Sequence, residues 1–146
     1  MGKIELPSSG HSIYLDACVF IYRLEMVVPF AALLSPMWRA FEHNSLKAKT
    51  SELTLVEVLV KPIREKDRFL TDLYRKSVCQ AAGFSTIGIT LELLESAAVL
   101  RARHKLSTPD AIHAATALAA GCAQFITNDP VFRRVPNLNV TILSEL

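Results

Sequence analysis

The chain has 146 residues, of which 51% are hydrophobic and 21% charged, and its formal net charge is +2. A chain of this length and composition can bury one sizeable core, so we expect a single domain over residues 1–146. So small a net charge does not by itself indicate a nucleic-acid-binding protein.

Neither the apolar stretches nor the N-terminal segment indicates a membrane protein. The most apolar stretches, residues 26–38 and 111–126, are interrupted by proline or polar residues, so neither predicts a membrane span. The segment MGKIELPSSG has no long apolar run and no myristoylation motif, and we expect a cytoplasmic protein without a membrane partner. The three cysteines, Cys18, Cys79 and Cys122, have no zinc-site spacing, which favours buried, reduced thiols.

Short apolar strands alternate with helices in the first half of the chain. Ser35-Pro36 and Pro62 are the expected helix breakers, because proline lacks the amide hydrogen that a helix interior needs. In chain order, this half predicts a strand over residues 12–15, a helix over 17–24, one or two short helices over 29–43, a strand over 47–50, a helix limited by Pro62 and a helix over 64–80.

The second half contains the clearest helix boundaries. Thr90 is a good N-cap, and Thr108 is another, with Pro109 at the first helical position and Gly121 as terminator. In chain order, this half predicts a strand over residues 84–89, helices that begin after Thr90 and Thr108, and strands over 123–127 and 139–143. Strands that alternate with helices predict a parallel sheet covered on both faces, an α/β sandwich.

Four acidic residues are placed where they could meet. Asp16 and Asp129 follow expected strands, whereas Glu57 and Asp110 lie near the starts of expected helices. In open parallel sheets the functional site lies beyond the C-terminal ends of the strands, where the strand order reverses. Crowded carboxylates repel one another and are tolerated mainly when a hard cation such as Mg²⁺ or Mn²⁺ binds their oxygens. The sequence therefore predicts a metal site made of four carboxylates.

Each acid also has a structural explanation when it is taken alone. Asp16 could cap the next helix, Asp110 could complement a helix dipole, and Asp129 could hold an Asx turn. Glu57 has capping-box spacing from Thr54, although a helix that starts upstream would place Glu57 too deep for that role.

Several other residues have two readings each. His113, one turn after Asp110, either reaches the same site or is a buried histidine with a satisfied hydrogen bond. Arg133 and Arg134 either contact RNA phosphates or form a solvated turn. The basic residues within 61–76 and 101–105 form either a surface for polyanions or ordinary solvated helix faces.

The chain resembles the PIN domains, and most closely the VapC-like toxins of type II toxin-antitoxin systems. The resemblance rests on four segments in matching order and spacing: IYLDACVFIY, TSELTLVEVLVKP, LSTPDAIHAATALAAG and FITNDPVF. It implies a PIN-like three-layer α/β/α sandwich with a central, mainly parallel sheet. It also implies a metal-dependent endoribonuclease that uses Mg²⁺ or Mn²⁺, whose acidic residues match Asp16, Glu57, Asp110 and Asp129.

The same resemblance implies a supporting residue and partners. Thr127 matches the hydroxyl residue that usually precedes the family's last acid by two positions and supports the site, whereas Cys18 stands where the family often has asparagine. The implied partners are an RNA substrate, a cognate antitoxin and a second copy in a homodimer. In the family, a groove formed by early helices receives the antitoxin's C-terminal segment, and part of the apolar cluster within residues 27–38 is either such a groove or core.

Carboxylates and a bound cation would activate a water molecule for attack on a phosphodiester. We expect Asp16, Asp110 and Asp129 to be ligands, direct or through water, and Glu57 to be a further ligand or to orient the water. The alternative is a PIN-like module that binds RNA or a protein without cutting it.

Overall fold

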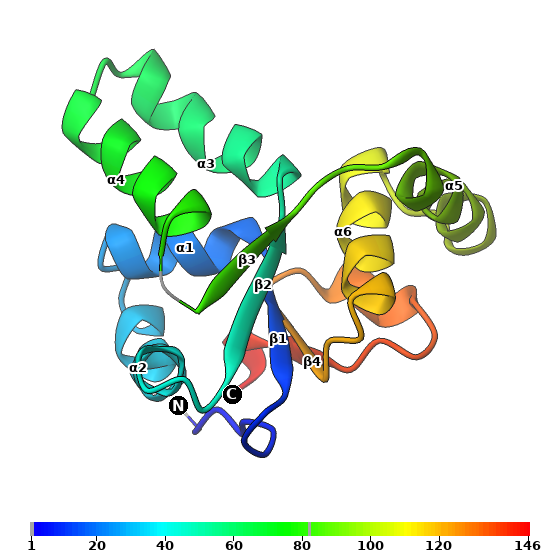
Figure 1. Ribbon diagram of the computed structural model, residues 1–146, viewed down its shortest axis with the longest axis horizontal. Helices are drawn as coiled ribbons and strands as arrows, with labels where there is room; N and C mark the ends of the chain where they lie inside the picture. Colours follow the sequence, from blue (N-terminus) through cyan, green and yellow to red (C-terminus); the bar gives the residue numbers. More distant parts are fainter. Residues whose placement is uncertain (1, 82) are drawn as a thin grey trace.

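In the computed structural model, which describes residues 2–81 and 83–146, five parallel strands form one sheet in the order β3-β2-β1-β4-β5. Helices cover both faces of the sheet (Figure 1). The expected three-layer α/β/α sandwich is therefore confirmed. The strands are β1 (Ser12–Leu15), β2 (Lys47–Ser51), β3 (Phe84–Ile87), β4 (Gln124–Thr127) and β5 (Val140–Ile142). The helices are α1 (Ala17–Leu24), α2 (Phe30–Glu42), α3 (Leu53–Arg64), α4 (Arg68–Cys79), α5 (Leu91–His104) and α6 (Thr108–Ala119), with 3-10 turns η1 (Pro130–Arg134) and η2 (Leu143–Glu145).

The two faces of the sheet bury different halves of the core. Successive side chains of a strand point to opposite faces, so Ile13 and Leu15 pack in one cluster and Tyr14 packs in the other. The first cluster lies under α1, α2 and α4, and the second lies between the sheet and helices α5 and α6. Tyr14 is fully buried and stacks on Phe125, with 4.9 Å between the ring centroids.

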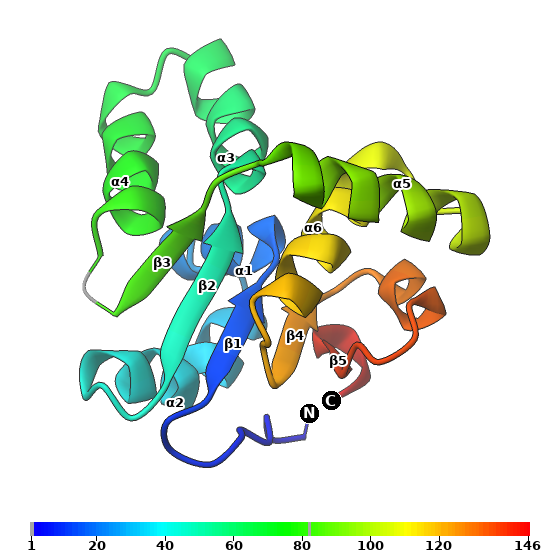
Figure 2. The same cartoon turned by 45° about the vertical axis from the view of Figure 1, so that its right-hand side comes forward.

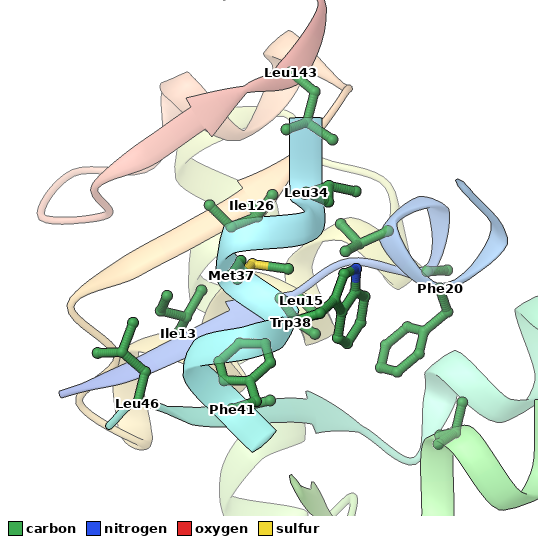
Figure 3. Close-up of a cluster of buried hydrophobic side chains, with 14 of the residues drawn as sticks. Ile13, Leu15, Phe20, Leu34, Met37, Trp38, Phe41, Leu46, Ile126 and Leu143 are labelled. Carbon is green, nitrogen blue, oxygen red and sulfur yellow. The ribbon is translucent and has the colours of Figure 1, made fainter. Parts of the chain in front are cut away.

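Helix α2 supplies the large side chains of the first cluster (Figure 3). Met37, Trp38 and Phe41 are buried, and the ring of Trp38 stacks on that of Phe84 at 5.7 Å. Each such side chain contributes about 1.5–3 kcal/mol through burial. The apolar cluster expected within residues 27–38 is thus split, because Leu34, Met37 and Trp38 are core whereas Val28 is exposed.

Two helices continue through prolines where the sequence predicts a break. Pro36 lies inside α2 and Pro62 lies inside α3, so both expected breaks are wrong. An internal proline costs a helix about 3 kcal/mol. Burial of Met37 and Phe41 on α2, and of Pro62 itself on α3, offsets that cost. Tertiary packing therefore overrides the local preference at both positions.

Side-chain caps set the observed helix starts. Thr90 caps α5 as expected, and its hydroxyl accepts from the amide of Leu93 at 3.1 Å. The N-cap of α6 is Ser107 rather than Thr108. Helix α4 begins after the capping residue Asp67, later than the expected start at residue 64.

The cysteines are free, as expected. Cys18 and Cys122 are half-buried, but Cys79 is exposed, so the expectation of a buried thiol is wrong for that residue. Among residues 2–81 and 83–146, no helix is both long and apolar enough to cross a membrane.

The strand order reverses at β1, which pairs with β2 on one side and with β4 on the other. Helices α3 and α4 pack together as one pair, and α5 and α6 as a second. Figure 2 shows the C-terminal ends of the strands directed toward these two pairs. This edge is where a functional site is expected in an open parallel sheet.

Candidate active site

Asp16 lies at the reversal point, directly after β1. Its Oδ1 accepts from the amide of Ala17 at 2.8 Å, which caps α1, and its Oδ2 accepts from the hydroxyl of Thr127 at 2.6 Å. Burial raises the pKa of Asp16, although the charge of His113 and the hydrogen bond from Thr127 favour the charged form. Asp16 is therefore a helix cap and also a half-buried carboxylate whose charge is only partly compensated.

His113 joins three elements at this place. Its side chain is 1% exposed, its Nε2 hydrogen-bonds to Oε1 of Glu57, and the same atom lies 4.0 Å from Oδ1 of Asp16. Its Nδ1 lies 2.6 Å from the hydroxyl of Tyr14. Burial lowers the pKa of His113, but the hydrogen bond to Glu57 and the charge of Asp16 raise it above the usual value. The histidine is buried with satisfied nitrogens, and it also reaches the acidic residues.

Glu57 comes to the site from the second turn of α3. The N-cap of this helix is Glu52, so Glu57 lies too deep for a capping box with Thr54, and that explanation is wrong. The Glu57 side chain is 33% exposed, which leaves it open to solvent on one side and bonded to His113 on the other.

Asp110 and Asp129 lie at the margins of this group. Asp110 is in the first turn of α6, one turn before His113, and its charge contributes to the raised pKa of that histidine. Asp129 is exposed and caps η1, because its Oδ1 accepts from the amide of Val131 at 2.9 Å. Its own amide donates to Oγ1 of Thr127 at 3.1 Å, so Thr127 links Asp129 to Asp16. The Asx-turn explanation therefore holds for Asp129.

A hard cation requires several oxygen ligands that converge on one point. Across the described ranges 2–81 and 83–146, no group of three or more His, Cys, Asp and Glu side chains is arranged to hold a metal ion. Asp16 and Glu57 nevertheless each have a carboxylate oxygen within 4.0 Å of Nε2 of His113, and such oxygens are the ligands that Mg²⁺ and Mn²⁺ prefer. A cation would also offset the charge that burial makes costly on Asp16. The chemistry of the donors fits the expected ion.

The family is established by sequence. Residues 13–138 match the family model described as the PIN domain. The chain belongs to the PIN-domain family. No protein with curated annotation matches the chain.

Solved structures with the same fold include proteins of toxin-antitoxin systems. The chain is 25% identical to a chain of a toxin-antitoxin complex from Klebsiella pneumoniae, with a TM-score of 0.65 over 88% of this chain and 95% of that one. It is 15% identical to a chain of VapBC2 from Rickettsia felis bound to a promoter DNA fragment, with a TM-score of 0.69 over 90% and 98%. It is 17% identical to Mycobacterium tuberculosis VapC20, a sarcin-ricin loop cleaving toxin, with a TM-score of 0.69 over 83% and 92%. The last two similarities, at these identities, show the fold alone.

Cys18 lies two positions after the first aspartate of this PIN domain, where the resemblance leads us to expect asparagine. Burial raises the pKa of the Cys18 thiol to about 12, and the charge of Asp16 adds to the effect. The thiol is therefore neutral near pH 7 and supplies no thiolate to the acidic group.

Sequence reasoning missed Tyr14 in this PIN domain. The available signal was a tyrosine in a strand expected to be buried, because a buried phenol needs a hydrogen-bond partner. Its partner, His113, is 99 residues away in the chain.

Arg133 and Arg134 are engaged within the protein, Arg133 with the carboxylate of Glu145 and Arg134 with the carbonyl oxygen of Lys105. Their contact with RNA phosphates stays a prediction.

The Thr127 hydroxyl is expected to support metal binding by this PIN domain. Thr127→Val removes the donor to Asp16 and the acceptor for the amide of Asp129. We expect Mn²⁺ affinity, measured by calorimetry, to fall by roughly 10–100-fold, as is typical when an outer partner of a metal ligand is lost. The matched control is Thr86→Val, which removes a threonine hydroxyl of β3 that donates to the backbone carbonyl of Val78 in α4. An equal loss of affinity in both variants would contradict the assignment.

Proposed function

We propose that this PIN domain is a Mg²⁺- or Mn²⁺-dependent endoribonuclease and the toxin of a type II toxin-antitoxin pair. The observation that carries the proposal is Asp16 at the strand reversal, held by Thr127 and flanked by His113 and Glu57. The family match and the fold shared with toxin-antitoxin proteins support it. The printed description of VapC20 as a toxin that cleaves the sarcin-ricin loop supports RNA as the substrate class.

In this proposal the acidic residues hold the cation. Asp16, Asp110 and Asp129 are its ligands, direct or through water, and Glu57 is a further ligand or orients the attacking water. The ion, when bound, lowers the pKa of a coordinated water and offsets charge on the phosphoryl oxygens.

The other residues act through these acids. Thr127 fixes one oxygen of Asp16, and Ala17 donates its amide to the other, so the carboxylate has a defined orientation. His113 holds one oxygen of Glu57, which leaves the second oxygen free to accept a proton from water.

We place the antitoxin on the groove beside α1 and α2. Arg23, Met26, Val28, Trp38 and Arg39 line this groove, and Met26 and Val28 are largely exposed. The guanidinium of Arg23 lies 4.1 Å from the centroid of the Trp38 ring. Apolar anchors with a charged rim suit a peptide segment that carries both apolar and acidic side chains.

The proposed protein is also a homodimer, in which a second copy covers apolar side chains. Val60 and Ile63 on α3 and Leu91 on α5 are apolar side chains left exposed in the single chain. A second copy would remove such side chains from water, which favours association. The absolute molecular mass in light scattering measures this directly.

The decisive experiment is cleavage of an end-labelled, structured RNA by purified protein free of antitoxin. We expect cleavage with Mg²⁺ or Mn²⁺, loss of cleavage with EDTA, and a reduction of roughly 10²-fold or more in Asp110→Asn, because a metal ligand is lost. The matched control is Asp72→Asn, which neutralises an exposed aspartate of α4 that pairs with Arg75.

The outcomes separate the candidate functions. Cleavage that survives EDTA and Asp110→Asn would indicate a contaminating nuclease. RNA or antitoxin binding without cleavage, in a protein that binds no Mn²⁺, would favour the non-catalytic module instead.

A further inference from the structure

The hydroxyl of Tyr14 lies in the core and hydrogen-bonds to His113. Tyr14 is fully buried in β1 on the face covered by α6. Its ring is fixed on one side by stacking on Phe125 and meets the imidazole of His113 edge-on, with centroids 5.9 Å apart. The hydroxyl oxygen lies 2.6 Å from Nδ1 of His113. A buried phenol must place its proton in a hydrogen bond, and this nitrogen is within ideal distance.

The direction of that hydrogen bond decides what the other nitrogen does. A neutral imidazole has one donor and one acceptor nitrogen, and a hydrogen bond at one of them determines which is which. If the Tyr14 hydroxyl donates to Nδ1, the proton of neutral His113 must be on Nε2. Nε2 faces Oε1 of Glu57, and carboxylate oxygens only accept, so this tautomer satisfies both ends of the imidazole. The opposite tautomer would leave Nε2 without a proton beside Glu57 and Asp16.

We propose that Tyr14 is a positioning residue: it donates to Nδ1 of His113 and thereby fixes the Nε2–H that holds Glu57 beside Asp16. The tautomer rests on the hydrogen bonds alone. The consequence for metal binding and cleavage rests on the proposed function.

The protein contains a matched control for the contacts that link Tyr14, His113 and Glu57. Tyr74 is also buried, at 1% exposure, and its hydroxyl donates to a carboxylate oxygen of Glu25. It lies on α4 in the other core cluster. Tyr14→Phe and Tyr74→Phe each remove a buried tyrosine hydroxyl that hydrogen-bonds to a polar side chain, but only the first contacts His113. A merely structural role for the hydroxyl predicts similar behaviour of the two variants.

The first measurement is ¹⁵N NMR of histidine-labelled protein in mildly alkaline buffer, without metal. In the wild type we expect the Nδ1 signal of His113 in the range of an unprotonated acceptor and the Nε2 signal in the range of a protonated nitrogen. Tyr14→Phe is expected to shift His113 toward a mixture of tautomers, whereas Tyr74→Phe leaves the spectrum unchanged. The chain has four histidines, and His113→Gln identifies the resonances. A protonated Nδ1 in the wild type, or an unchanged spectrum in Tyr14→Phe, overturns the proposal.

The second measurement is Mn²⁺ affinity by calorimetry, together with steady-state cleavage. Both are measured on the wild type, Tyr14→Phe and Tyr74→Phe. We expect Tyr14→Phe to weaken Mn²⁺ binding or to lower kcat by about 10-fold, with KM for RNA unchanged, because Tyr14 acts through Glu57 rather than through RNA. A shifted tautomer with wild-type Mn²⁺ affinity and kcat overturns the positioning role. A wild type that cleaves no RNA and binds no metal, but shows the expected NMR signals, overturns the proposed function and leaves the tautomer assignment standing.

Discussion

Asp16→Asn is expected to lower metal-dependent RNA cleavage severely while leaving the protein folded. The Asp16 side chain is 14% exposed, and burial raises its pKa, so the folded protein bears a cost for the charge. Asparagine caps a helix as well as aspartate does, and its oxygen can still accept from Thr127 or Ala17. We therefore expect a melting temperature equal to or above that of the wild type. Cleavage should fall by roughly 10³-fold, more than the 10–100-fold typical of residues that only support a ligand.

This variant separates the two explanations of Asp16. If Asp16 were only the N-cap of α1, Asp16→Asn would retain cleavage and Mn²⁺ affinity. Thermal melting, calorimetry with Mn²⁺ and the end-labelled RNA assay, run on one preparation, distinguish the cases. Loss of cleavage together with a lowered melting temperature would contradict the expectation, since the charge would then be stabilising the fold.

The largest effect on stability is expected from Phe41→Ala. Phe41 is 2% exposed and packs edge-on against Trp38 and Phe84, with ring centroids 5.7 Å and 5.5 Å apart. Truncation removes the apolar contacts and leaves a cavity, so the free energy of unfolding should fall by about 3–5 kcal/mol. Urea denaturation followed by circular dichroism measures the change.

The matched control for this truncation is Phe69→Ala on α4. Phe69 is 80% exposed, and surface substitutions usually change stability by no more than about 0.5 kcal/mol. A loss below about 1 kcal/mol in Phe41→Ala, or equal losses in both variants, would show that α2 is not anchored to the sheet as the structure describes.

Local sequence signals predicted most of the fold correctly because they depend on residues close together in the chain. The five strands, the cap at Thr90 and the parallel arrangement of the strands follow from apolar runs and capping residues read over a few positions. The same reasoning failed at Pro36 and Pro62, where burial of one helix face outweighs the cost of proline. It also placed the cap of α6 one residue late, since Ser107 and Thr108 are equally suitable caps by type.

The candidate site was predicted less completely. The position of Asp16 after a buried strand followed from the sequence, because parallel strands bring their C-terminal ends to one edge. The partner of Glu57 did not follow, since Glu57 and His113 are 56 residues apart and meet only when α3 and α6 are placed on the sheet. Asp129 is an exposed turn residue linked to the site through Thr127, a relation that the order of the acids does not indicate.

The sequence by itself therefore determined the parallel α/β/α sandwich, the four acids in their order and the resemblance to PIN domains that the family match confirms. Only the tertiary structure decided that Tyr14 and Glu57 bond the two nitrogens of His113, and that this imidazole lies beside Asp16. The physical reason is distance along the chain. Strands and caps are stabilised by neighbours a few residues away, whereas a buried hydrogen-bond network depends on which side chains the packed helices bring to one edge of the sheet.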